Sequence, residues 1–275
     1  MSTPFVPYIL GATLTEQQRL IAQAQGLEEY AAWMLDRIPI RPGFRAVDVG
    51  CGPIGIMNLL SERVGSHGAV VGVERESRFA DMAREGLKER GLANVTVVNA
   101  DALKTGLAKN HYDIVHERLV LINIPPASQQ ALLAEMLSLL KPGGIIALEE
   151  FDFASYVCYP AHASWETLFS IWSDTFHAAG GNLFVGRSLA GLLRSIGVEN
   201  VQIKAHAAIP QIGEYQRTHL LSLVESLHEP MLASGRITLR ELGKHVAALR
   251  EHLANPDTTI LDRLVVQAWG QRPSD

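Results

Sequence analysis

Three glycines, Gly50, Gly52 and Gly55, follow a short apolar segment with the spacing G-x-G-x-x-G in "DVGCGPIG". Glycines at this spacing let the backbone approach a ligand closely where a strand leads into a helix. Glu74 follows about 20 residues later, where a carboxylate can accept the hydroxyl groups of a ribose. The pattern therefore predicts an adenosine-containing cofactor, but alone it does not separate a nicotinamide dinucleotide from other candidates.

Two further carboxylates favour a cofactor without phosphate. Asp48 stands two residues before Gly50, where it would repel the pyrophosphate of a dinucleotide. S-adenosylmethionine (SAM), with an amine, a sulfonium and no phosphate, would tolerate that carboxylate. Asp101 follows the third expected strand, and there it can accept a hydrogen bond from the adenine amine. The order of these acids favours SAM over a nicotinamide cofactor.

A second set of ionisable residues stands at the ends of the fourth and fifth expected strands. His116, Glu149 and Glu150 are the candidate catalytic bases, and Glu117 and Asp152 lie beside them in the sequence. His116 is the first choice because histidine titrates near neutral pH, although it could instead line the cofactor without moving a proton. One of Glu149 and Glu150 should face the pocket, since side chains alternate along a strand. No ligand spacing of a known metal site is present, so no metal is expected.

Alternating apolar strands and helices must position these groups. This pattern predicts an α/β fold with a parallel sheet that is covered by helices on both faces. Two helices are expected before residue 38, the first capped by Thr13 and Glu16. The expected strands are 45–49, 69–74, 95–100, 112–116, 145–150, 198–207 and 259–270, and the later helices are 162–179, 186–197, 213–229 and 239–254, the last capped by Thr238 and Glu241.

The segments "AVDVGCGPIG", "VVGVERE", "VNADAL", "YDIVHERLVL" and "LLKPGGIIALEE" resemble, in this order, the motifs of class I SAM-dependent methyltransferases with a Rossmann-like fold. The opening "YILGATLTEQQRLIAQA" resembles the N-terminal lid of a bacterial small-molecule branch of that family. The resemblance implies a seven-stranded sheet with an antiparallel last strand. It divides the chain into a helical lid (1–40), a SAM-binding core (41–210), a helical insert (211–257) and a final core strand (258–275).

The resemblance also implies a set of cofactor contacts, with Arg19, Arg118 and Gln23 reaching the SAM carboxylate. The full expected set is Asp48, Gly50, Gly52, Glu74, Arg75, Asp101, Ala102, His116, Arg118 and Gln23. For the substrate, the aromatic residues Tyr8, Tyr156 and Trp165 on the lid segments suit a flat small molecule. For the aromatic stripe over 165–176, packing of a helix onto the sheet is the favoured explanation.

The expected reaction is direct in-line displacement of the SAM methyl group onto a small-molecule acceptor, such as a secondary metabolite, leaving S-adenosylhomocysteine. A cyclase or isomerase of the same fold that binds SAM without transferring its methyl is the alternative. The 275 residues carry a formal charge of −5 and no Lys/Arg-rich run, which argues against a nucleic-acid partner.

The expected location is the cytoplasm. Two cysteines cannot form a disulfide framework, and neither a signal-peptide pattern nor a membrane-spanning apolar run is present. The helices expected near 213–254 could cap the pocket or form the contact of a homodimer.

Overall fold

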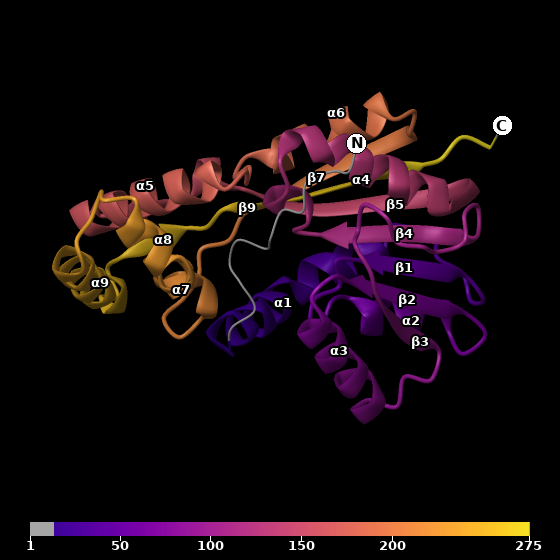
Figure 1. Ribbon diagram of the computed structural model, residues 1–275, viewed down its shortest axis with the longest axis horizontal. Helices are drawn as coiled ribbons and strands as arrows, with labels where there is room; N and C mark the ends of the chain where they lie inside the picture. Colours follow the sequence, from indigo (N-terminus) through magenta and orange to yellow (C-terminus); the bar gives the residue numbers. More distant parts are fainter. Residues whose placement is uncertain (1–13, 275) are drawn as a thin grey trace.

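A twisted seven-stranded sheet forms the centre of the protein, as Figure 1 shows for the computed structural model, which describes residues 14–274. The strand order is β3-β2-β1-β4-β5-β9-β7, and only β9 runs antiparallel to its neighbours β5 and β7. The predicted Rossmann-like sheet with an antiparallel last strand is thus confirmed. The strands are β1 (Arg45–Val49), β2 (Ala69–Glu74), β3 (Val95–Asn99), β4 (Tyr112–Arg118), β5 (Leu140–Asp152), β7 (Glu199–His206) and β9 (Leu264–Gln271).

Helices cover both faces of the sheet, which is why its central strands carry apolar side chains on both faces. One apolar cluster joins Met34 of α1, Leu60 of α2 and Ala83 of α3 to the sheet. A larger cluster joins Leu133 of α4 and Leu193 of α6 to the opposite face. The helices are α1 (Leu14–Leu35), α2 (Met57–Val64), α3 (Ser77–Glu89), α4 (Pro126–Leu139) and α6 (Leu189–Ser195).

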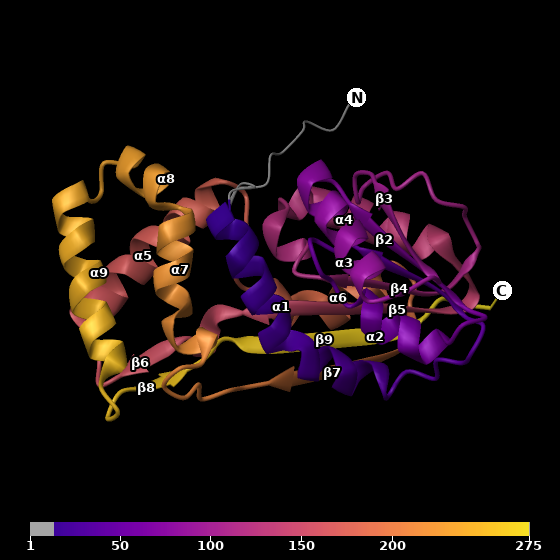
Figure 2. The same ribbon diagram turned by 90° about the horizontal axis from the view of Figure 1, so that it is seen from below.

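A helical lobe extends beyond one end of the sheet, and α1 lies between this lobe and the sheet (Figure 2). The helix α5, which precedes β7 in the chain, packs against α9 and α7 in this lobe. A small two-stranded sheet of β6 and β8 closes its base. Its elements are β6 (Val157–Tyr159), α5 (Ala163–Ala178), α7 (His219–Ser226), α8 (His228–Ala233), α9 (Leu239–Ala254) and β8 (Thr259–Leu261).

Three sequence-based boundaries were wrong. The two N-terminal helices are one continuous helix, and Gly26 within it gives room to Gln216, whose side-chain nitrogen would lie 2.3 Å from a Cβ at that position. The helix expected over 213–229 is broken into α7 and α8, because Pro230 has no N–H with which to continue α7. The last expected strand is likewise divided into β8 and β9.

One of the two expected helix caps lies within the described residues. The Thr238–Glu241 capping box is confirmed. Thr13, the other expected cap, and Tyr8, an expected substrate contact, lie outside the described residues. Within residues 14–274, no helix combines the length and the apolar character needed to cross a membrane.

A buried arginine holds together the end of α9 and the segments that follow β7 and precede β8. Arg217 is 5% exposed, and its guanidinium donates hydrogen bonds to four backbone carbonyl groups. The accepting oxygens belong to Leu253 (2.8 Å), Pro210 (3.3 Å), Asn255 (2.8 Å) and Thr258 (2.8 Å). Two of these carbonyls end α9, where the helix dipole favours a cation.

We expect Arg217→Met to lower the free energy of unfolding by about 3–5 kcal/mol, because it would leave these buried carbonyls without donors. Urea unfolding of wild type and variant measures the change. Arg240→Met, at an exposed position of α9, is the control and should change stability by less than about 0.5 kcal/mol. A loss below about 1 kcal/mol in Arg217→Met would show that the carbonyls find other donors.

Candidate functional site

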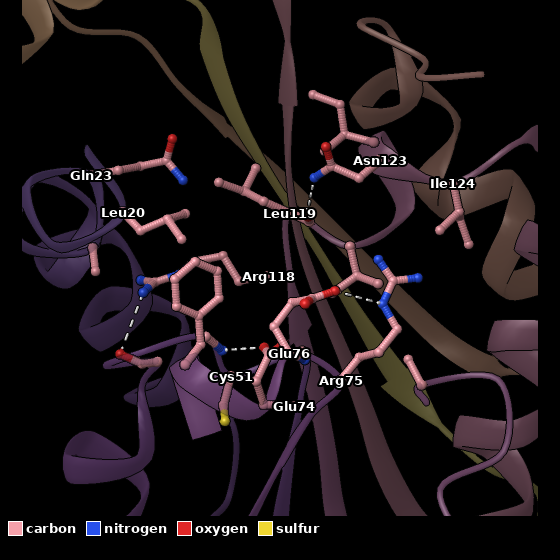
Figure 3. A pocket seen from close by; sticks show the side chains of 18 of the residues that line it. Leu20, Gln23, Cys51, Glu74, Arg75, Glu76, Arg118, Leu119, Asn123 and Ile124 are labelled. Atoms are coloured by element: carbon pink, nitrogen blue, oxygen red, sulfur yellow. Dashed lines mark hydrogen bonds and ion pairs between the residues drawn. The ribbon is translucent and has the colours of Figure 1, made fainter. Parts of the chain in front are cut away.

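One large pocket opens at the carboxyl ends of β1, β2 and β4, where a parallel α/β sheet binds its ligands. Its cavity measures about 390 Å³. Figure 3 shows Leu20 and Gln23 of α1 on one side and Asn123 and Ile124, from the loop after β4, on the other. The lobe closes the far end through His219 and Leu223 of α7. The same cavity therefore joins the glycine loop to the helical lobe.

The glycine loop between β1 and α2 depends on the buried carboxylate of Asp48. Its Oδ2 atom accepts a hydrogen bond from the backbone N–H of Ile56 (2.9 Å), at the start of α2. Gly55 has φ +51°, and a Cβ there would lie 2.4 Å from Oδ2 of Asp48. Gly50 and Gly52, with φ +69° and +56°, line the pocket. The spacing of the motif is thus required by the close packing of this turn.

His116 lies beneath this loop, in β4 beside β1. Its Nδ1 atom is 2.8 Å from Oδ1 of Asp48, and the residue is fully buried. His116 is not among the described residues that line the pocket. We expected its side chain to face the cofactor, but register places it opposite Asp48 on the neighbouring strand, where the carboxylate binds it from within the core.

Glu74 and Asp101 line the pocket at the ends of β2 and β3. The carboxylate of Glu74 accepts hydrogen bonds from the backbone N–H groups of Gly52 (2.9 Å) and Glu76 (2.7 Å). Burial raises the pKa of Glu74. Oδ1 of Asp101 accepts from Leu103 N (2.8 Å) and so caps a turn. The expected neighbours Arg75 and Ala102 also line the pocket.

The expected carboxylate-binding group, Arg118, Arg19 and Gln23, comes together at one wall of the pocket. Arg118 donates to the carbonyl of Gly55 at 3.4 Å (Figure 3). Arg19 forms a buried two-pronged ion pair with Glu16 (2.6 and 2.7 Å) and donates to Oε1 of Gln23 (2.7 Å). The fold thus places Arg19 and Gln23 of α1 and Arg118 of β4 in the lining of one pocket.

Glu117 and Glu150 face each other in the core and hold the loop that follows β4. Oε2 of Glu117 accepts from Val120 N (3.0 Å), and Oε1 of Glu150 accepts from Ile122 N (3.2 Å). Burial raises the pKa of Glu117 to about 7, and burial together with Glu117 raises the pKa of Glu150 well above its usual value. The two carboxyl groups therefore fix the backbone of the loop after β4.

Glu149, on the opposite face of β5, is also fully buried. It accepts a hydrogen bond from Gln267, whose side chain also donates to the carbonyl of Tyr30 (2.7 Å). Neither Glu149 nor Glu150 is among the described residues that line the pocket. We expected one of the two to face it, but β5 is covered on both faces at this point.

The pair of Glu117 and Glu150 predicts a stability that falls as pH rises. A folded pKa above the unfolded value makes the folded state bind the proton more tightly, so stability is lost between about pH 4.5 and above pH 7. Across this pH range, we expect the free energy of unfolding to change by up to about 3 kcal/mol less in Glu117→Gln than in wild type. Urea unfolding at several pH values measures it, with the exposed Glu62→Gln as control. Parallel profiles for wild type and Glu117→Gln would contradict the assignment.

The far end of the pocket is an aromatic chamber, defined here by Phe151, Phe153, Trp172, Phe176 and Leu183. The rings of Trp172 and Phe176 are stacked with centroids 5.4 Å apart, and Phe153 lies 5.6 Å from Trp172. These residues come from β5, the turn after it, α5 and the loop after α5.

The expected substrate residues Tyr156 and Trp165 pack against each other behind this chamber, with centroids 4.7 Å apart. Both are buried, and neither is among the described pocket-lining residues. Their placement matches core packing. Phe153, in the turn after β5, and Trp172, on α5, line the cavity instead. Which side of α5 lines the cavity depends on the rotation of this helix against the sheet.

His219 is a pocket residue that the sequence analysis missed. It begins α7, is 1% exposed and lines the pocket. Burial, then Arg263 and Arg19, lower its pKa well below the usual value. The only sequence signal was a histidine within the apolar run "HLLSLV", which does not reveal the direction of the ring. Among residues 14–274, no group of three His, Cys, Asp or Glu residues is arranged to hold a metal ion.

Comparison with known proteins identifies the fold family. The family model described as "Methyltransferase domain" matches residues 40–201, more than half of the chain. The chain belongs to this methyltransferase family. The demethylmenaquinone methyltransferase of Anoxybacillus flavithermus is 32% identical over 126 residues, which cover 44% of this chain and 52% of that protein. The methyltransferase chain thus spans about half the length of the curated relatives it matches.

Solved structures share the methyltransferase fold over nearly the whole chain. Phosphoethanolamine N-methyltransferase 2 of Haemonchus contortus, in complex with phosphomonomethylethanolamine and S-adenosylhomocysteine, has a TM-score of 0.63 at 15% identity and covers 99% of this chain and 61% of its own. The [4+2]-cyclase SpnF has a TM-score of 0.55 at 17% identity, and the match covers 91% of this chain and 83% of the SpnF chain. SAM is the cofactor that accompanies this family.

The residues at the glycine-loop end of the pocket suit SAM. Carboxylates at the ends of three successive strands line this end of the pocket, where they suit a ligand with an amine and two ribose hydroxyls and would repel a phosphate. Gly52 has open space at its Cβ position, which leaves room for a ligand beside the backbone. These features distinguish the site from a pyrophosphate-binding loop.

Proposed function

We propose that this chain is a SAM-dependent methyltransferase that methylates a small-molecule acceptor. The observation that carries the proposal is the continuity of one cavity, from the glycine loop with Asp48, Glu74 and Asp101 to the aromatic chamber. A cofactor at the first end and an acceptor at the second would meet in the middle of the cavity. Bound SAM supplies a methyl group on a sulfonium, which is ready for direct displacement.

The chain's own residues have separate tasks in this proposal. Glu74 would accept hydrogen bonds from the ribose, and Asp101 from the adenine amine. Arg118 and Gln23 would hold the carboxylate of SAM. Arg118 already donates a hydrogen bond to the carbonyl of Gly55. The enzyme then contributes mainly by fixing the acceptor in line with the methyl group and by excluding water.

The acceptor class follows from the chamber. Phe151, Phe153, Trp172 and Phe176 offer broad apolar surfaces that favour a flat, apolar molecule over a charged one. A related protein carries the name demethylmenaquinone methyltransferase, which fits an acceptor with a ring system. A ring-bearing secondary metabolite is therefore the substrate class that we propose.

A non-methylating cyclase or isomerase is the second candidate, supported by the likeness of the fold to the cyclase SpnF. The two functions differ in product mass. Methyl transfer adds one methyl group to the acceptor and converts SAM to S-adenosylhomocysteine, whereas cyclisation leaves both masses unchanged. Incubation with methyl-labelled SAM and an extract of small metabolites decides between them, because label in an extractable product requires transfer.

We expect Glu74→Ala to weaken S-adenosylhomocysteine binding by about 10- to 100-fold, because it removes a charged acceptor from the ribose. Isothermal titration calorimetry measures the affinity, and NADH in a parallel titration should bind no tighter than background. Glu85→Ala, at an exposed position of α3, is the control and should bind like wild type. Unchanged affinity in Glu74→Ala, or tight binding of NADH, would contradict the cofactor assignment.

A further inference from the structure

The ring of His219 meets the pocket with both nitrogen atoms free of hydrogen-bond partners among the described residues. A buried imidazole normally has a partner, because leaving a polar group unpaired costs about 1–3 kcal/mol. His219 is 1% exposed, so bulk water does not replace that partner. The residue lines the cavity beside Leu223, one turn later on α7. A ligand in the cavity is therefore the group that would satisfy it.

The indole nitrogen of Trp172 is a second buried polar atom of the pocket that has no hydrogen-bond partner among the described residues. The rings of Phe153 and Phe176 lie 5.6 and 5.4 Å from that of Trp172, and Leu183 lines the same pocket. The chamber thus combines broad ring surfaces with one imidazole and one N–H donor. This combination suits a flat molecule that carries few polar atoms.

Burial keeps the ring of His219 neutral, and two nearby arginines add to this effect. Arg19 approaches it from α1 and Arg263 from the segment before β9, and both disfavour a second positive charge. The ring of Tyr215, from the turn before α7, lies 5.1 Å from the imidazole. Burial, then Arg263 and Arg19, lower the pKa of His219 well below its usual value. At neutral pH the ring therefore has one nitrogen that can accept a hydrogen bond or a proton.

The acidic groups of the pocket lie at its other end, by the strand ends. Its carboxylates, Asp48, Glu74, Glu76 and Asp101, stand at or just after the ends of β1, β2 and β3. His219 is the one histidine among the described residues that line the pocket. A base for an acceptor in the aromatic chamber is thus available from α7 alone.

We propose that His219 is the catalytic residue that binds the reacting hydroxyl group of a neutral, flat acceptor and takes its proton. The inference rests on the proposed methyltransferase function and adds the acceptor class, an aromatic or enolic hydroxyl compound without charge. In the step, the acceptor oxygen forms a bond to the methyl carbon, and the O–H proton passes to a ring nitrogen of His219. The carbon–sulfur bond breaks with its electron pair on sulfur.

The step moves one positive charge from the sulfonium to the imidazole. The sulfonium begins with one positive charge, and after the step the imidazolium carries it, so the cavity gains no net charge. The proton then leaves to solvent with opening of the pocket, which restores the neutral ring.

Binding of 2-naphthol tests the polar contact without any turnover. Naphthalene has the same ring surface but no hydroxyl group, so the ratio of the two affinities reports the contact. With saturating S-adenosylhomocysteine present, we expect wild type to prefer 2-naphthol by about tenfold, since one hydrogen bond to a buried unpaired group has this size. His219→Phe should reduce the ratio to about one. His177→Phe, at an exposed position of α5, is the control and should keep the wild-type ratio.

Methylation of 2-naphthol tests the proton transfer itself. Wild type should show kcat/KM that is nearly independent of pH above neutrality, because the base is already neutral. His219→Asn can accept a hydrogen bond but no proton, so its rate should be at least about 100-fold lower. That rate should rise about tenfold per pH unit as the naphthol ionises in water.

Three results would overturn the proposal: an unchanged affinity ratio in His219→Phe, a pH profile of His219→Asn that matches wild type, or no detectable binding of 2-naphthol by wild type. Calorimetry with S-adenosylhomocysteine separates these from a failure of the proposed function. If wild type and both His219 variants bind S-adenosylhomocysteine alike, the cofactor site stands and only the role of His219 is refuted. If wild type does not bind it, the methyltransferase proposal itself fails.

Discussion

The buried carboxylate of Asp48 is the interaction on which the rest of the pocket depends. It joins β1, where it stands, to the start of α2 through Ile56 and to β4 through His116. A buried carboxylate is costly unless donors surround it, and here each oxygen atom has one. The same carboxylate leaves no room for a side chain at Gly55. Glycine loop, helix start and strand register are thus fixed together by one group.

This constraint divides the ionisable residues at the sheet edge into two groups. Those at the ends of β2 and β3, Glu74 and Asp101, lie at the surface of the cavity. Those of the two central strands, Glu117 in β4 and Glu150 in β5, are covered by neighbours on both faces and hold the loop that lines the pocket. Because the carboxylates of the central strands are held in the core, the proton acceptor that we propose for the aromatic chamber, His219, comes from the helical lobe.

The sheet could be predicted from the sequence because a strand buried on both faces is a short apolar run between turns. That Gly50, Gly52, Glu74 and Asp101 line one pocket could be predicted too, since they stand at the ends of those strands or directly after them. The acceptor end could not. Which side of α5 faces the cavity, so that Trp172 lines it and Trp165 does not, depends on packing between segments far apart in sequence. His219 likewise reaches the pocket only because α7 packs beside α1 at the end of the sheet (Figure 2).

A crystal structure with S-adenosylhomocysteine bound tests most directly whether one cavity serves both ends of the reaction. We predict that the sulfur lies in the middle of the cavity and faces the aromatic chamber, with a ring nitrogen of His219 on the acceptor side and Glu74 at the ribose. A sulfur atom directed away from the chamber, or a His219 ring separated from it by protein side chains, would contradict this arrangement.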